Sequence, residues 1–87
     1  MESKSGCVLV VEDDPIIQAL VQQGLGAVGY ETIMAGSGKA LFDTLDKEKE
    51  RIVLILLDPG LPYIVEIRKV TSVPIAVLTG RSASTIN

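Results

Sequence analysis

One run of residues near the N-terminus carries the clearest information on the fold, and it reads Cys7-Val8-Leu9-Val10-Val11-Glu12-Asp13-Asp14-Pro15. Its apolar, largely β-branched part predicts a strand that is buried on both faces. Asp14 and Pro15 then predict a helix start. An aspartate can accept hydrogen bonds from free N–H groups, and proline lacks the N–H that the first helical position leaves unpaired.

The same alternation of strand and helix continues along the chain. Apolar residues at helical spacing predict a first helix that ends at about Val28, with Gly29 as its stop; they are Ile16, Ile17, Leu20, Val21, Leu25 and Val28. A second helix is expected at 39–47, with Ala40, Leu41 and Leu45 facing inward, and a short amphipathic one at 63–70. Further strands are expected at 30–35, 52–57 and 75–78, and the polar residues 82–87 could begin another helix.

The predicted order is β-α-β-α-β-α-β, and three of the strands are apolar throughout. Such strands need cover on both faces, so the sequence predicts an α/β fold in which helices flank a parallel sheet.

Composition excludes several classes of function. The 87 residues allow one domain, and 47% of them are apolar, so intrinsic disorder is not expected. With 8 basic and 11 acidic residues and no basic patch, the chain lacks the charge for direct nucleic-acid binding. Histidine is absent, which excludes Ser-His-Asp catalysis and histidine metal sites.

The expected location is the cytoplasm. The single cysteine, Cys7, cannot form an internal disulfide and is expected to be a small core residue. The longest apolar runs are far shorter than the roughly 20 residues that span a bilayer. Residues 1–6 are polar and lack the apolar segment of a signal peptide, so we expect no contact with a membrane.

Acidic and hydroxyl side chains follow three of the expected strands. Glu12 and Asp13 follow the first strand, Asp58 the third and Thr79 the fourth. In open parallel sheets, binding and catalytic residues usually lie at the edge formed by the carboxyl ends of the strands. Carboxylates that meet there repel one another, and a divalent cation such as Mg²⁺ would offset their charge. One of them could then accept a phosphoryl group, with the Thr79 hydroxyl bonded to a phosphoryl oxygen. Taken alone, Asp14 is explained as a helix cap, and the residues after Asp58 as a turn.

Three motifs in this order resemble a two-component response-regulator receiver (CheY-like) domain, and most closely the receivers fused to winged-helix DNA-binding domains. The motifs are Val8-Leu9-Val10-Val11-Glu12-Asp13-Asp14-Pro15, Ile55-Leu56-Leu57-Asp58-Pro59-Gly60-Leu61-Pro62 and Val73-Pro74-Ile75-Ala76-Val77-Leu78-Thr79-Gly80-Arg81. The resemblance covers nearly the whole chain. It implies a flavodoxin-like parallel sheet with strand order 2-1-3-4, numbered along the chain, and with the family's fifth strand absent.

The resemblance also implies roles for individual residues. Asp58 would be the phosphoacceptor and Thr79 the switch hydroxyl. Mg²⁺ would be bound by Asp13, Asp58 and the main-chain carbonyl of Gly60, with Glu12 acting through water.

The sequence departs from the family in two places. The segment after Pro62 is shorter than in the family. The family's fourth helix, its fifth strand with the lysine that pairs with the phosphate, and its fifth helix would lie beyond Asn87. Residues 1–87 would then form an incomplete receiver, whose strand at 75–78 is left as an open edge. Either residues are missing from this sequence or the domain is truncated.

The leading hypothesis is a phosphoacceptor module that is not an enzyme. A sensor histidine kinase would phosphorylate Asp58 with Mg²⁺, and the output would be transcription, through a homodimer or through DNA bound by a separate output domain. The alternative is a truncated interaction module of the same fold that acts without phosphorylation. A weaker possibility is a Mg²⁺-dependent phosphatase.

Overall fold

A five-stranded sheet forms the centre of the molecule in the structure, a computed structural model that describes residues 6–58, 63–78 and 83–86. The strands are β1 (Cys7–Val11), β2 (Glu31–Ala35), β3 (Ile52–Leu57), β4 (Ile75–Leu78) and β5 (Ala83–Ile86). They lie in the order β2-β1-β3-β4-β5. The first four are parallel to one another, and β5 runs antiparallel to β4.

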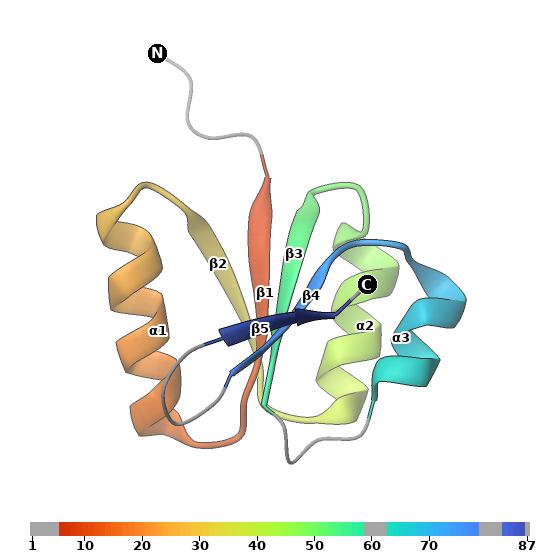
Figure 1. Cartoon of the computed structure of the whole chain (residues 1–87), viewed down its shortest axis with the longest axis horizontal. Coiled ribbons are helices and arrows are strands. Elements are labelled where there is room, and N and C mark those ends of the chain that lie inside the picture. The colour runs from red at the N-terminus through yellow and green to blue at the C-terminus, as the bar shows by residue number, and fades with distance from the viewer. Residues whose placement is uncertain (1–5, 59–62, 79–82, 87) are drawn as a thin grey trace.

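Among the described residues, three helices cover the two faces of this sheet: α1 (Pro15–Ala27), α2 (Gly38–Glu48) and α3 (Ile64–Val70). Figure 1 shows α1 on one side of the sheet and α2 and α3 on the other. The flavodoxin-like α/β class and the order 2-1-3-4 of the parallel strands are thus confirmed.

The alternation of side chains along β1 divides the core into two parts. Leu9 and Val11 face α2 and α3, where they pack with Leu41, Leu45 and Ile67. Val8 and Val10 face the other way, into a smaller cluster that the partly buried Val21 and Leu25 of α1 help to cover. Every residue of β1 is buried, as its unbroken apolar run predicts.

Both ends of α1 confirm the predicted signals. Asp14 caps the helix, since its Oδ1 accepts a hydrogen bond of 2.9 Å from the main-chain N–H of Ile16, and Pro15 occupies the first turn. Gly29 follows the C-terminus with a φ of 93°, a left-handed conformation that glycine adopts without steric cost.

The C-terminal segment corrects two of the predictions. Residues 83–86 form the strand β5 rather than the start of a helix, and they pair with β4 from Leu78↔Ala83 to Ile75↔Ile86. The edge of β4 is therefore not open. An edge strand offers unpaired N–H and C=O groups, and an antiparallel neighbour can reach them through a short connection.

The first helix is less buried than its apolar spacing suggests. No residue of α1 is fully buried, and the side chains of Ile16 and Leu20 are 70% and 60% exposed. In α2, by contrast, Leu41 and Leu45 are buried as predicted, and Ala40 is partly buried. Apolar periodicity identifies the helix but does not tell how many neighbouring elements cover it.

Candidate acidic site at the carboxyl edge of the sheet

The sheet places Glu12 and Asp58 side by side. The N–H of Glu12 donates to the carbonyl of Ala35 at the end of β2, and the N–H of Asp58 donates to the carbonyl of Val11, each at 3.0 Å. Both acidic residues therefore continue the parallel ladder one step beyond the strands. The pairing Val11↔Leu57 brings them to the same edge.

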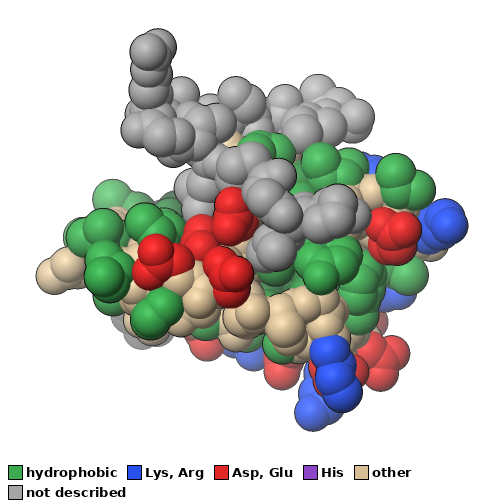
Figure 2. All heavy atoms as spheres, turned by 90° about the horizontal axis from the view of Figure 1, so that it is seen from below, with side chains coloured by type: hydrophobic (Ala, Val, Ile, Leu, Met, Phe, Trp, Pro, Cys, Tyr) green, Lys and Arg blue, Asp and Glu red, His purple; other side chains and the backbone are tan. Residues whose placement is uncertain are grey.

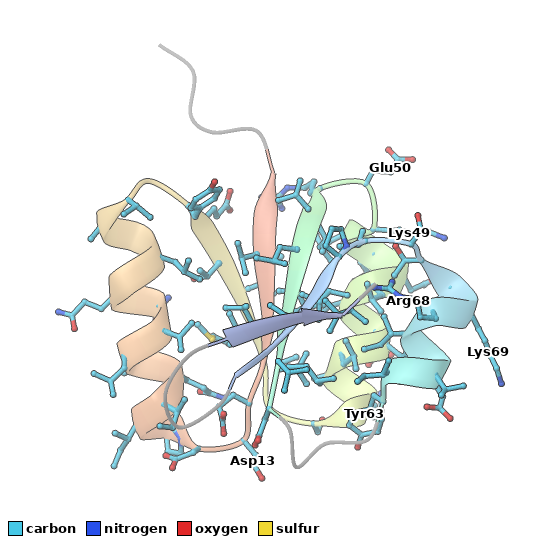
Figure 3. All side chains as sticks on the ribbon, in the orientation of Figure 1. Asp13, Lys49, Glu50, Tyr63, Arg68 and Lys69 are labelled. Carbon is cyan, nitrogen blue, oxygen red and sulfur yellow. The ribbon has the colours of Figure 1, made fainter. Side chains whose placement is uncertain are left out.

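Three carboxylates meet at this edge. One oxygen each from Glu12, Asp13 and Asp58 lies within 4.8 Å of the others. Figure 2 shows acidic side chains gathered on the face that contains this edge, and Figure 3 shows Asp13 pointing away from the end of the sheet. The predicted convergence of the acidic residues after the first and third strands is thus present in the structure.

The three carboxylates have different surroundings. Glu12 is only 6% exposed, Asp58 is half-buried and Asp13 is exposed. The side chain of Glu12 accepts a hydrogen bond of 3.0 Å from the main-chain N–H of Asp14. The buried carboxylate of Glu12 can therefore be held in place by its neighbours, while the exposed carboxylate of Asp13 stays open to solvent.

Burial raises the pKa of Glu12 above its ordinary value. The N–H of Asp14 opposes this effect, and the negative charges of Asp58 and Asp13 raise the pKa further. A bound cation would favour the ionised form of all three acids. Hard divalent cations take oxygen ligands, and carboxylate oxygens at this spacing could hold one such ion.

Asp14 has a separate task in this turn. Its Oδ1 caps α1 while its own N–H supports Glu12. It is not one of the three clustered acids, which agrees with its predicted role as a helix cap.

Two of the predicted site residues, Gly60 and Thr79, lie outside the described residues. Cys7 is fully buried in β1, as expected for a core residue. Burial raises the pKa of its thiol, and the charge of Glu31 adds to this effect.

The prediction from sequence missed one residue at this edge. The side-chain amide of Gln18 in α1 donates a hydrogen bond of 2.5 Å to the main-chain carbonyl of Glu12. A signal was present, because Gln18 is the only residue with a polar side chain from Pro15 to Val21.

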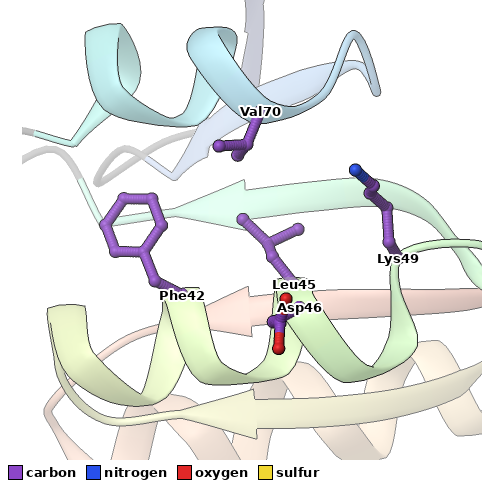
Figure 4. A pocket seen from close by; sticks show the side chains of 5 residues that line it. All are labelled: Phe42, Leu45, Asp46, Lys49 and Val70. Atoms are coloured by element: carbon purple, nitrogen blue, oxygen red, sulfur yellow. The ribbon is translucent and has the colours of Figure 1, made fainter.

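A pocket of about 180 Å³ lies between α2 and α3, away from the acidic edge. Phe42, Leu45 and Val70 give it apolar walls, and Asp46 and Lys49 complete its lining (Figure 4). Lys49 and Asp13 lie at opposite ends of the molecule (Figure 3). The pocket contains none of the clustered acids.

Within the described ranges, no helix has the length and apolar character needed to cross a membrane.

Comparison with known proteins gives relatives over most of the chain. The transcriptional regulatory protein YrkP of Bacillus subtilis is 36% identical over 80 residues, which cover 88% of this chain and 35% of that protein. The transcriptional regulatory protein AruR of Pseudomonas aeruginosa is 36% identical over 84 residues, or 86% of this chain and 34% of that protein. The probable transcriptional regulator ycf27 of Pyropia yezoensis is 34% identical over 85 residues, or 91% and 34%.

The chain spans about a third of the length of these relatives. No family model matches it. The relatives are transcriptional regulators of the response-regulator type. Their similarity over most of this chain agrees with the predicted resemblance to a response-regulator receiver domain.

Proposed function

We propose that this chain is the phosphoacceptor receiver module of a two-component signalling system. A sensor histidine kinase would donate the phosphoryl group to Asp58. A carboxylate oxygen of Asp58 bonds to phosphorus while the phosphorus–nitrogen bond of the donor phosphohistidine breaks, and the imidazole leaves with the electron pair of that bond.

The observation that carries this proposal is the meeting of Glu12, Asp13 and Asp58 within 4.8 Å at the edge of the sheet. A lone surface aspartate would repel an incoming phosphoryl group, which is itself anionic. A cluster of negative charge around the half-buried Asp58 could bind a cation, and that cation would attract the oxygens of the incoming phosphoryl group.

Mg²⁺ is the cation we propose for this site. When bound, it would offset the negative charge that develops on the transferred group. Asp13 and Asp58 would ligate it directly and Glu12 through a water molecule, in keeping with the small number of carboxylates that Mg²⁺ takes from a protein. The main-chain carbonyl of Gly60 and the hydroxyl of Thr79 complete the proposed site as metal ligand and switch residue.

The proposed output is the regulation of transcription. The relatives that match the chain are named transcriptional regulators, which supports a regulatory rather than an enzymatic role. Phosphorylation would bias a two-state equilibrium, which a homodimer or a DNA-binding output domain would read. Such a module would act in the cytoplasm, where its kinase presents the phosphohistidine.

The test uses acetyl phosphate as a small phosphoryl donor. The purified chain is incubated with acetyl phosphate and Mg²⁺, and the intact mass is measured. We expect a mass gain of one phosphoryl group. EDTA in the reaction should prevent this gain, and later treatment with hydroxylamine, which cleaves acyl phosphates, should remove it.

Two variants make the result specific. Asp58→Asn should abolish the mass gain, whereas Asp46→Asn, an exposed aspartate in α2 that lies outside the acidic cluster, should retain it. A wild-type chain that binds Mg²⁺ but gains no mass would contradict the phosphoacceptor role and favour an interaction module that acts without phosphorylation.

A further inference from the structure

Gln18 holds the turn between β1 and α1 with two hydrogen bonds. Its main-chain N–H donates to the carbonyl of Asp14 at 2.9 Å, as expected for the first turn of a helix. Its side-chain Nε2 donates to the carbonyl of Glu12 at 2.5 Å. One residue of α1 is therefore bonded to both ends of the segment that contains Asp13.

The carbonyl of Glu12 needs such a donor. Glu12 is 6% exposed, and a main-chain carbonyl in buried surroundings is costly to leave unpaired. Glu12 lies beyond the last residue of β1, while its N–H still bonds to Ala35. The amide of Gln18 reaches its carbonyl from the helix that covers this face.

The backbone just after the second strand lies near this amide. A Cβ added to Gly36 would lie 3.7 Å from Nε2 of Gln18 and 4.0 Å from the carbonyl oxygen of Glu12. These are ordinary contact distances for an added side-chain atom, so the backbone just after β2 lies near the hydrogen bond. The hydrogen bond from Gln18 to Glu12 thus connects α1 to the end of β1, close to the end of β2 and to the acidic cluster.

The two peptide units that flank Asp13 are therefore both held. On one side the carbonyl of Glu12 accepts a hydrogen bond from Gln18, and on the other the N–H of Asp14 donates to the carboxylate of Glu12. Asp13 itself is exposed, and packing does not hold its side chain in place. Its carboxylate can stay near Asp58 only if the backbone that carries it keeps its orientation.

We propose that Gln18 is a positioning residue of the acidic site, which keeps Asp13 directed toward a bound divalent cation without touching the cation. This inference rests on the proposed function only as far as cation binding. It goes further by assigning a role in metal affinity to a neutral residue outside the carboxylate cluster. Residues that orient metal ligands typically affect affinity about 10-fold or more.

The experiment compares Mg²⁺ affinity in two variants of α1. Gln18→Met keeps the length and lacks the donor, and Gln22→Met makes the same change one turn later, at an exposed position. Isothermal titration with MgCl₂ should show affinity about 10-fold weaker for Gln18→Met and unchanged for Gln22→Met. Urea unfolding in EDTA, measured in parallel, separates a loss of affinity from a loss of folded protein.

A spectroscopic signature tests the same point in the wild-type chain. The side-chain amide signals of Gln18 should shift in ¹⁵N-edited spectra when Mg²⁺ is added, while those of the exposed Gln22 and Gln23 should not. A purely structural role for Gln18 would lower the urea midpoint of Gln18→Met and leave its Mg²⁺ affinity equal to wild type, which would overturn the proposal.

The phosphoacceptor role and the positioning role of Gln18 can fail separately, and the measurements distinguish the two cases. If the wild-type chain binds Mg²⁺ with the predicted dependence on Gln18 but accepts no phosphoryl group, the positioning role stands and the phosphoacceptor role is contradicted. If the wild-type chain binds no Mg²⁺ at all, both are contradicted.

Discussion

The ring of Tyr63 lies against Gly38 so closely that a Cβ on this glycine would be 2.6 Å from Cζ and Oη of the tyrosine. Gly38 is the first residue of α2, and Tyr63 immediately precedes α3. The same ring meets Phe42 edge-on, with a centroid distance of 6.1 Å and an interplanar angle of 90°. The starts of the two helices are thus joined by an aromatic contact that has no space for a side chain at position 38.

Gly38→Ala should therefore destabilise the fold. The added methyl group must displace the Tyr63 ring, which Phe42 holds from another side, and overpacking of this kind costs about 1–3 kcal/mol. Urea unfolding measures the loss. In a Tyr63→Ala background the same substitution should cost little, because the ring that it would strike is gone.

Gly24→Ala is the matched control. Gly24 lies inside α1, and a Cβ there would have no neighbour within 4 Å. Alanine is the better helix former, so this variant should gain up to about 1 kcal/mol. Equal effects of the two substitutions would show that the Tyr63 contact does not restrict position 38.

The thiol of Cys7 should react very slowly in the folded chain. It is fully buried in β1, so a reagent cannot reach the sulfur easily. Burial together with the charge of Glu31 also raises its pKa, so little of the reactive thiolate is present. Ellman's reagent should modify it about 10³-fold more slowly than in urea, because core strands open only with global unfolding. An Ala19→Cys variant, with a second thiol at an exposed position, should show one fast and one slow phase. Two fast phases would contradict a stable β1.

The elements that could be predicted are those with strong local signals. The apolar run of β1, the Asp14-Pro15 start of α1 and the Gly29 stop depend on residues close in sequence. The strand β5 could not be predicted, because Ser84 and Thr85 suit an edge strand as well as a helix start. What decides between them is the free edge of β4, which is a tertiary property.

The site divides in the same way. Glu12, Asp13 and Asp58 could be predicted because acids at the ends of parallel strands meet at one edge. The hydrogen bond from Gln18 to Glu12 could not, because it depends on the angle at which α1 leaves the turn. The exposure of Ile16 and Leu20 was missed for a related reason, since sequence spacing does not reveal how much of the face beside α1 other elements cover.

The raised pKa of Glu12 predicts a definite pH dependence of stability. The folded state binds this proton more tightly than the unfolded state, whose pKa is near the ordinary 4.5. The stabilisation is therefore complete below that value, and it is lost as the pH rises through the raised pKa of the folded state. In EDTA, the free energy of unfolding of wild type should fall relative to Glu12→Gln as the pH increases over this range.

Glu12→Gln is a suitable reference because its amide oxygen can still accept the hydrogen bond from Asp14. Urea midpoints of the two proteins are compared at several pH values, so that titrating groups far from Glu12 cancel. A difference that stays constant with pH would contradict the raised pKa. Excess Mg²⁺ should reduce the pH dependence, because a nearby cation lowers the pKa of the acid.

Asp13→Asn should have opposite effects with and without a divalent cation. In EDTA the variant should melt at a higher temperature than wild type, since it removes one of three clustered negative charges. With Mg²⁺ at about 100 times its dissociation constant, wild type should gain about 2.7 kcal/mol from binding, whereas the variant should gain little. The order of the two melting temperatures should therefore reverse on addition of MgCl₂. Asp46→Asn, which leaves the cluster intact, should respond to Mg²⁺ as wild type does. If Asp13→Asn were to gain as much as wild type, Asp13 would not be a metal ligand, and the cation would have to be held by the other proposed ligands.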